Sequence, residues 1–231
     1  MPINPKKSLA TFSLTSCGGC LEVLNENTNR YSGLQNFYEI ERFLPNKIEK
    51  KYDIVIIEGH PLTEKQIGSA KLIRRQAKIV VALGSCAHIG GVYDEMVTLL
   101  PKEKRARKLL SEIVRVDYIV PGCPPDQAEL TRCLMDLYWG KIFCLPDLAV
   151  CFECRQNENV CLIKKNKLCL GPITRMGCNS ICVNNGEACL GCRGLKPDAN
   201  IRKMTEILKP IIPEFEAKKI MSIFGNLDAK Q

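Results

Sequence analysis

The chain has 231 residues, of which 45% are hydrophobic, and a formal net charge of +8. This length suits one large domain, or a medium domain followed by a smaller one, and the apolar fraction is sufficient for a core. No stretch approaches the roughly 18 apolar residues that a membrane span requires. The N-terminal segment "MPINPKKSLATFSLTSC" lacks the apolar run of a signal peptide. We therefore expect a cytoplasmic protein without a membrane span.

Short β-branched runs alternate with helical stretches over the first two-thirds of the chain. Strands are predicted over residues 8–14, 52–59, 77–86 and 116–123. Two helices are predicted from capping boxes, Thr63 with Gln66 and Asp126 with Glu129, and a shorter one follows Cys20. Near-continuous apolar strands separated by helices indicate a parallel sheet covered on both faces. The fold class is thus predicted as α/β, with a flavodoxin-like, doubly wound parallel sheet.

A domain boundary is expected near Pro146. It gives a flavodoxin-like domain over residues 1–145 and an irregular C-terminal domain over residues 146–231. In the helical tail, Asp198 is expected to cap a short amphipathic helix, and a second helix is expected from Glu214. The basic run "PKEKRARK" at residues 101–108 is predicted to be the solvated face of a further helix.

The chain contains 14 cysteines, far more than packing requires, and eight of them lie between Cys151 and Cys192 with no histidine among them. Disulfides, zinc and iron–sulfur clusters are the competing explanations. Without an export signal, dense cysteine usually indicates metal.

Four cysteines lie at or after the ends of the predicted strands: Cys17, Cys20, Cys86 and Cys123. Open α/β sheets bind ligands beyond the carboxyl ends of their strands, so these four are expected to converge there from three separate loops. Zinc remains possible for such a set. A closed zinc site, however, usually joins two local CxxC pairs, which favours an iron–sulfur cluster here.

The motifs "TSCGGCLE", "EGHP", "GSCAHIGGV" and "VPGCPPD" closely resemble the N-terminal domain of the small, electron-transferring subunit of nickel–iron hydrogenases. The likeness covers roughly residues 8 to 192, because "CLGPITRMGC" and "CLGC" resemble the second half of that family. The resemblance implies a proximal [4Fe–4S] cluster bound by the first four cysteines, facing an active site in the large subunit. The complex I relative carries adjacent cysteines where this chain has "CGGC", which argues against that alternative.

The same resemblance implies ligands for two further clusters. The distal ligands are expected to be Cys151, Cys154, Cys161 and Cys169, and the medial ligands Cys178, Cys189 and Cys192. Exported, membrane-associated members have a histidine in place of Cys151, and only three medial cysteines, whereas here Cys182 could supply a fourth ligand. Three [4Fe–4S] clusters bound by cysteine alone are therefore predicted. Cys133 is expected to be a packing residue and Cys144 a core thiol at the domain junction.

With Cys151 in place of a histidine and with the additional Cys182, the chain resembles the cytoplasmic, multisubunit group of these enzymes, whose members pair with flavin subunits. The resemblance implies that the chain performs no bond chemistry itself. It is expected to relay electrons between the Ni–Fe site of a large subunit and a flavin-bearing or other redox partner, as the complex oxidises hydrogen or reduces protons. The terminal acceptor stays undetermined.

Two alternatives remain at this point: an iron–sulfur subunit of another oxidoreductase such as a complex I relative, and a zinc-stabilised nucleic-acid-binding protein. The net charge of +8 favours the second. However, three clusters with four thiolates each would contribute about −6, leaving about +2. Only 6% of residues are aromatic, and basic residues do not alternate with stacking residues. Nucleic acid is therefore not expected as a partner.

Overall fold

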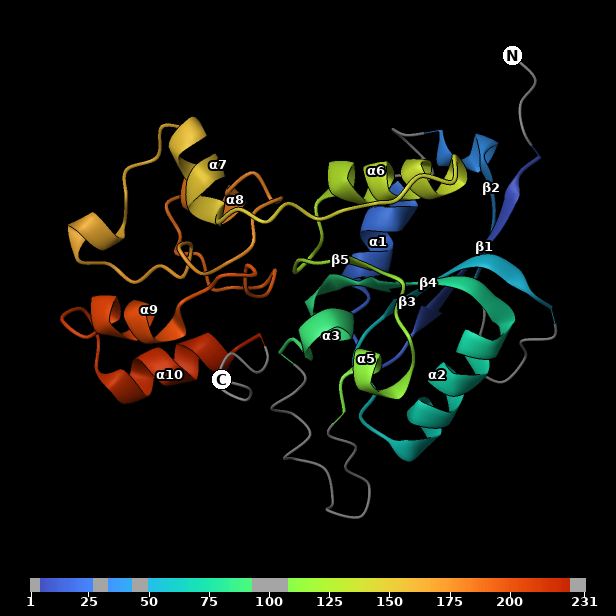
Figure 1. Cartoon of the computed structure of the whole chain (residues 1–231), viewed down its shortest axis with the longest axis horizontal. Coiled ribbons are helices and arrows are strands. Elements are labelled where there is room, and N and C mark those ends of the chain that lie inside the picture. Colours follow the sequence, from blue (N-terminus) through green and yellow to red (C-terminus); the bar gives the residue numbers. More distant parts are fainter. Residues whose placement is uncertain (1–4, 27–32, 43–49, 93–107, 225–231) are drawn as a thin grey trace. The chain divides into compact units, whose positions relative to one another are not determined.

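The computed structural model describes residues 5–26, 33–42, 50–92 and 108–224 (Figure 1). The chain divides into two compact units, Met1–Cys144 and Leu145–Gln231. Apart from Lys108, the basic run for which a helix is predicted lies outside the described residues. No helix in the described ranges is long and apolar enough to cross a membrane.

The first unit contains a five-stranded sheet whose neighbouring strands are all parallel, in the order β2-β1-β3-β4-β5. Its strands are β1 (Lys7–Ser13), β2 (Tyr38–Arg42), β3 (Tyr52–Glu58), β4 (Ala77–Leu83) and β5 (Tyr118–Val120). This strand order is that of the flavodoxin-like fold, so the predicted fold class is confirmed. Strand β2 is not among the predicted strands; it lies at an edge and carries charged residues at alternate positions.

Helices cover both faces of this sheet (Figure 1). Helices α1 (Gly19–Glu26) and α6 (Gln127–Tyr138) lie on one side, and α2 (Glu64–Gln76) and α5 (Leu110–Ile113) on the other. A short helix, α3 (Gly84–Ile89), follows β4 directly, and a 3₁₀ turn, η2, spans Leu34–Asn36.

Burial on both faces explains why the central strands β3 and β4 are almost continuously apolar. Residues 54–57 of β3 are completely buried, and two of them, Val55 and Ile57, pack with Ile73 of α2. On the opposite face, the Tyr38 hydroxyl donates a hydrogen bond to the carbonyl of Leu134 in α6, at 2.6 Å. The sheet is therefore a buried platform, and only its strand ends are available for a site.

The two predicted helix N-termini are present. The Thr63 hydroxyl accepts a hydrogen bond from the backbone N–H of Gln66, and the Asp126 carboxylate accepts one from that of Glu129. The Gln66 side chain does not complete a capping box with Thr63. Its oxygen accepts from the N–H of Leu62, and its amide nitrogen donates to the Thr15 hydroxyl at 2.9 Å. The start of α2 is thereby tied to the loop that follows β1.

The second unit contains only short helices joined by turns in the ranges that the structure describes. They are α7 (Val150–Gln156), the 3₁₀ turn η5 (Ile163–Lys165), α8 (Ile181–Asn184), α9 (Ile201–Leu208) and α10 (Glu214–Ser222). Helices α9 and α10 lie side by side (Figure 1) over a core that includes Leu170 and Met204. A separate core is formed by Val150, Val183, Cys169 and Cys189.

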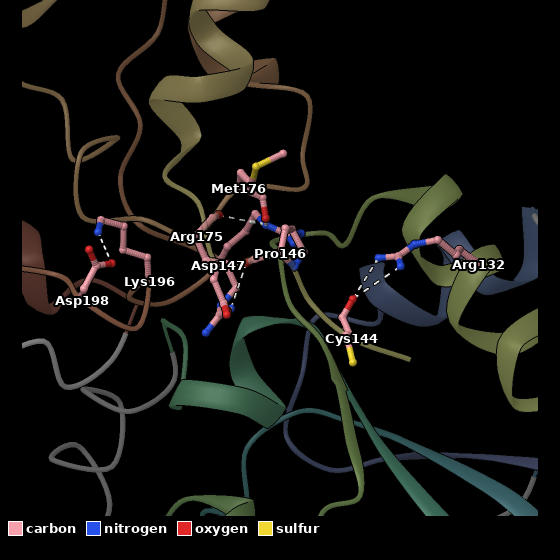
Figure 2. Close-up of polar contacts among 9 residues, drawn as sticks. Arg132, Cys144, Pro146, Asp147, Arg175, Met176, Lys196 and Asp198 are labelled. Carbon is pink, nitrogen blue, oxygen red and sulfur yellow. Dashed lines mark hydrogen bonds and ion pairs between the residues drawn. The ribbon is translucent and has the colours of Figure 1, made fainter. Parts of the chain in front are cut away.

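Two details of the second unit concern its turns and caps. The Arg175 guanidinium donates to the Pro146 carbonyl at 2.9 Å and to the Asp147 carboxylate at 2.7 Å, which ties the start of the unit to its interior (Figure 2). The predicted cap of α9 is wrong by two residues. Asn200 accepts from the N–H at position 203, while Asp198 pairs with Lys196.

Candidate metal centres

The structure places four cysteines beyond the carboxyl ends of the strands; we call Cys17, Cys20, Cys86 and Cys123 the proximal group. Cys17 lies in the loop after β1, and Cys123 in the turn after β5. The other two lie in helical turns rather than loops, Cys20 in the first turn of α1 and Cys86 within α3. Cys20 and Cys86 are buried, whereas Cys17 and Cys123 are exposed. The group therefore opens to the surface on one side.

Glycines allow the polypeptide to approach these sulfurs closely. Gly84 has a φ of +83°, and a Cβ atom at this position would lie 2.3 Å from Cys20 Sγ. A Cβ atom at Gly91 would lie 2.6 Å from Cys86 Sγ. Any residue with a side chain would thus displace a thiol of the group. Both the positive φ and the lack of space for a side chain require glycine at these two positions.

Glu58, at the end of β3, holds the segment between β1 and the start of α1, which carries Cys17 and Cys20. It is 1% exposed, and its carboxylate accepts hydrogen bonds from the hydroxyls of Ser13 and Ser16 and from the backbone N–H of Leu21. The two serines lie before Cys17, and Leu21 directly follows Cys20. Sequence reasoning does not assign this role, although a carboxylate at the end of an apolar strand in "YDIVIIE" is a usable signal.

The four thiols of the proximal group lie close enough to influence one another. Burial raises the pKa of Cys86 to about 12, with further contributions from Cys123, Cys17 and Glu58. Burial is also the main cause that raises the pKa of Cys20, followed by Glu58 and the other three thiols. Four thiolates in this position repel one another unless cations accompany them, and metal ions supply that compensation.

A second set of four cysteines lies in the second unit; we call Cys151, Cys154, Cys161 and Cys169 the distal group. Cys151 and Cys154 lie on α7. Burial raises the pKa of Cys151 to about 11, and the thiols of Cys169, Cys154 and Cys161 contribute to the shift. A Cβ atom at Gly171 would lie 3.4 Å from the sulfurs of both Cys151 and Cys169. All four predicted distal ligands are thus near neighbours.

We call the third set, Cys178, Cys182, Cys189 and Cys192, the medial group. Its electrostatic interactions link Cys178 with Cys182 and Cys189 with Cys192. Cys178 and Cys189 contact the same apolar core, which connects the two pairs. Cys189 also interacts with Cys169 of the distal group, and its carbonyl accepts a hydrogen bond from the residue after Cys169 at 2.7 Å. The medial and distal groups are therefore adjacent.

The chemistry of these groups fits iron–sulfur clusters. All twelve residues are cysteines, and thiolates are the usual ligands of [4Fe–4S] clusters. Over the described residues, no three or more histidine, cysteine, aspartate or glutamate side chains are arranged to hold a single metal ion. The glycines beside the sulfurs allow the backbone to lie as close to the ligands as an iron–sulfur cluster requires.

The two remaining cysteines differ in their surroundings. Cys133, on α6, is fully buried, in agreement with the predicted packing role. The prediction for Cys144 is wrong, because this residue is exposed rather than part of a core. Its carbonyl accepts hydrogen bonds from the guanidinium of Arg132 (Figure 2). That guanidinium lies over the Phe143 ring. The backbone, not the thiol, makes the contact here.

Residues 17–137 match the family of the NADH ubiquinone oxidoreductase 20 Kd subunit. The chain is 33% identical to the sulfhydrogenase 2 subunit delta of Pyrococcus furiosus, with 94% of this chain and 98% of that protein covered. It is 27% identical to the delta subunit of the NAD-reducing hydrogenase HoxS of Cupriavidus necator, over 61% of this chain and 83% of the relative.

Solved structures agree with these sequence matches. A chain of an NAD⁺-reducing [NiFe]-hydrogenase superposes with a TM-score of 0.51 at 27% identity, covering 62% of this chain and 96% of that one. A chain of the actinobacterial-type NiFe-hydrogenase from Ralstonia eutropha, at 14% identity, shares the fold over 97% of this chain and 87% of its own length, with a TM-score of 0.55. This protein belongs to the family of the NADH ubiquinone oxidoreductase 20 Kd subunit, and within it to the subunits of [NiFe] hydrogenases.

Proposed function

We propose that this chain is the electron-transfer subunit of a [NiFe] hydrogenase. It relays electrons between a Ni–Fe site on a separate large subunit and a flavin-bearing or other redox partner, while the complex oxidises hydrogen or reduces protons. The observation that carries the proposal is the proximal group, in which thiols from three strand ends converge beside a glycine that has no room for a side chain. The similarity to a hydrogenase subunit over nearly the whole chain supports it.

Three [4Fe–4S] clusters are proposed as the cofactors, one for each of the proximal, medial and distal groups. When bound, such a cluster supplies one-electron oxidation and reduction. The chain's own residues hold the ligands, bury them and exclude water. Cys189 of the medial group is buried and lies beside Cys169 of the distal group, so these two groups are suited to exchange electrons.

The exposure of individual thiols supports an assignment of partners. Cys17 and Cys123 open the proximal group to the surface, where we place the large subunit. Cys161 is the exposed member of the distal group, and we place the redox partner there. We propose the reducing cytoplasm as the compartment, because cysteines there stay available for metal binding rather than pairing in disulfides.

Metal analysis of the anaerobically purified chain tests this proposal. About twelve irons and a matching amount of sulfide per chain are expected for three clusters. In the complex with its large subunit, hydrogen gas is expected to bleach the cluster absorption. Tightly bound zinc without sulfide, or clusters that hydrogen does not reduce, would contradict the proposal.

Cys182→Ser tests the fourth medial ligand. Cys182 is exposed and interacts electrostatically with Cys178, so its loss is expected to alter the medial group alone. We expect conversion of that cluster to a three-iron form, a loss of about one iron per chain. Electron paramagnetic resonance of the reduced chain measures the change. A medial signal identical to that of the unmodified chain would rule out Cys182 as a ligand.

An iron–sulfur subunit of a complex I-like oxidoreductase is the second candidate, because the family match carries the name of the NADH ubiquinone oxidoreductase 20 Kd subunit. That match covers residues 17–137 only. The similarity to the sulfhydrogenase subunit, in contrast, covers 94% of the chain. The choice of reductant separates the two candidates: reduction by NADH with no response to hydrogen would favour the complex I-like function.

A further inference from the structure

One buried carboxylate connects the medial and distal groups. Glu153 lies on α7 between the distal ligands Cys151 and Cys154, and it is 8% exposed. Its Oε1 atom accepts hydrogen bonds from the backbone N–H groups of Gly177 at 3.0 Å and of Asn179 at 3.1 Å. These two peptide groups lie directly before and after Cys178. A single side-chain oxygen of the distal helix therefore holds both sides of a medial ligand.

The segment around Cys178 needs such support because its backbone is strained. Asn179 and Ser180 have φ values of 52° and 49°, in the left-handed region that residues with a side chain seldom adopt. Surrounding contacts must therefore hold the conformation. Asn157, which follows α7, adds hydrogen bonds to the Asn179 carbonyl and the Ser180 hydroxyl, both at 2.9 Å.

The second oxygen of Glu153 makes the burial costly. Oε2 is inaccessible to water and has no hydrogen-bond partner among the described residues. A buried carboxylate oxygen without a partner destabilises a protein, because the oxygen loses its hydration and gains nothing in return. A neutral or apolar residue at this position would avoid that cost. The negative charge at position 153 is therefore not explained by the two hydrogen bonds of Oε1 alone.

Two side chains of opposite charge bind the backbone close to Cys178. Arg193, which follows the medial ligand Cys192, is fully buried, and its Nε donates to the carbonyls of Arg175 and Met176. Arg193 thus binds the backbone two residues before Cys178, and Glu153 binds the N–H groups on either side of Cys178, so both charges lie near this residue. Charges beside a ligand sulfur change the potential of the metal group that it binds.

We propose that Glu153 is a positioning residue that fixes Cys178 relative to the distal helix and, through its negative charge, lowers the reduction potential of the medial group. The proposal rests on the proposed function, because it takes Cys178 to be a cluster ligand. Glu153 touches backbone N–H groups rather than a reacting atom. The separation of the two groups and the potential difference between them are thus controlled by the same side chain.

Three substitutions in the full chain test this proposal. Glu153→Gln keeps an oxygen that can accept from Gly177 and Asn179 but removes the charge. Glu153→Ala removes both. Glu216→Gln removes an exposed carboxylate on α10 and is the matched control. Iron, sulfide and a redox titration followed by electron paramagnetic resonance are measured for each anaerobically purified variant, and the proximal signal is the internal standard.

Glu153→Ala is expected to lose the medial cluster, about four of about twelve irons. Glu153→Gln is expected to retain all the iron and to shift the medial potential upward, with the proximal potential unchanged. Glu216→Gln is expected to match the unmodified chain. Full iron with an unchanged medial signal in Glu153→Ala would overturn the positioning role, and an unchanged medial potential in Glu153→Gln would overturn the electrostatic role. Absence of iron from the unmodified chain would instead overturn the proposed function.

Discussion

Cys20→Ala is expected to remove the proximal cluster and with it about four of the roughly twelve irons. Cys20 is buried and interacts with the other three thiols of its group, so alanine leaves that group without its proposed inner ligand. Changes next to a metal ligand cost about 10–100-fold in affinity or activity, so loss of the ligand itself should lower hydrogen-dependent electron transfer by more than about 100-fold. Iron content and the rate of acceptor reduction by the complex measure the effect.

The matched control is Cys133→Ala. Cys133 is also a buried cysteine of the first unit, but it lies on α6 and has a packing role. Its truncation is expected to leave the iron content and the rate unchanged and to lower the free energy of unfolding by about 1 kcal/mol. Equal iron contents in the two variants would show that Cys20 is not a ligand.

Gly84→Ala is expected to have nearly the same effect on the proximal group, although it removes no ligand. The new Cβ atom would lie 2.3 Å from Cys20 Sγ, which is far inside van der Waals contact, so the thiol or the backbone must move. The φ of +83° adds backbone strain, which costs about 1–2 kcal/mol for a residue with a side chain. We expect loss of about four irons and of the proximal signal in electron paramagnetic resonance.

Gly140→Ala is the control that separates the effect of backbone strain from that of the collision between the new Cβ atom and a thiol. Gly140 also has a positive φ, +71°, but a Cβ atom there meets nothing within 4 Å. This variant is expected to show the backbone strain alone, as a decrease of about 1 kcal/mol in the free energy of unfolding, and to keep its iron. If Gly84→Ala retained the proximal cluster, the close approach of the backbone to Cys20 would not be required for cluster binding.

The central strands and the fold class are predictable because their pattern is unambiguous. Residues 54–57 are buried on both faces, and an unbroken apolar run between helices has few other interpretations. The capping residues Thr63 and Asp126 are equally clear, because each side chain binds the N–H three residues later. Edge strand β2 escapes prediction because alternating charges at positions 39 and 41 resemble an exposed loop.

The environment of the predicted ligands is less accessible to sequence reasoning. "GSCAHI" after β4 resembles a loop because it begins with glycine and serine, but the chain enters α3 at once and Cys86 lies on a helix. Asp198 and Asn200 are both good caps, and only the geometry selects the second. Glu58 and Glu153 escape prediction because carboxylates are normally exposed, and only Glu58 has a local signal, its position at the end of an apolar strand.

The core beneath α7 and α8 has a consequence for how the protein is made. Two of its four buried residues are the thiols Cys169 and Cys189, and Cys154 and Cys178 pack against it. When metal ligands form the interior, much of the free energy of folding comes from metal binding, and an unloaded chain remains open to proteases. If the proposed clusters bind there, the supply of iron and sulfide to the nascent polypeptide would govern how many copies survive quality control, before it governs how fast any copy works.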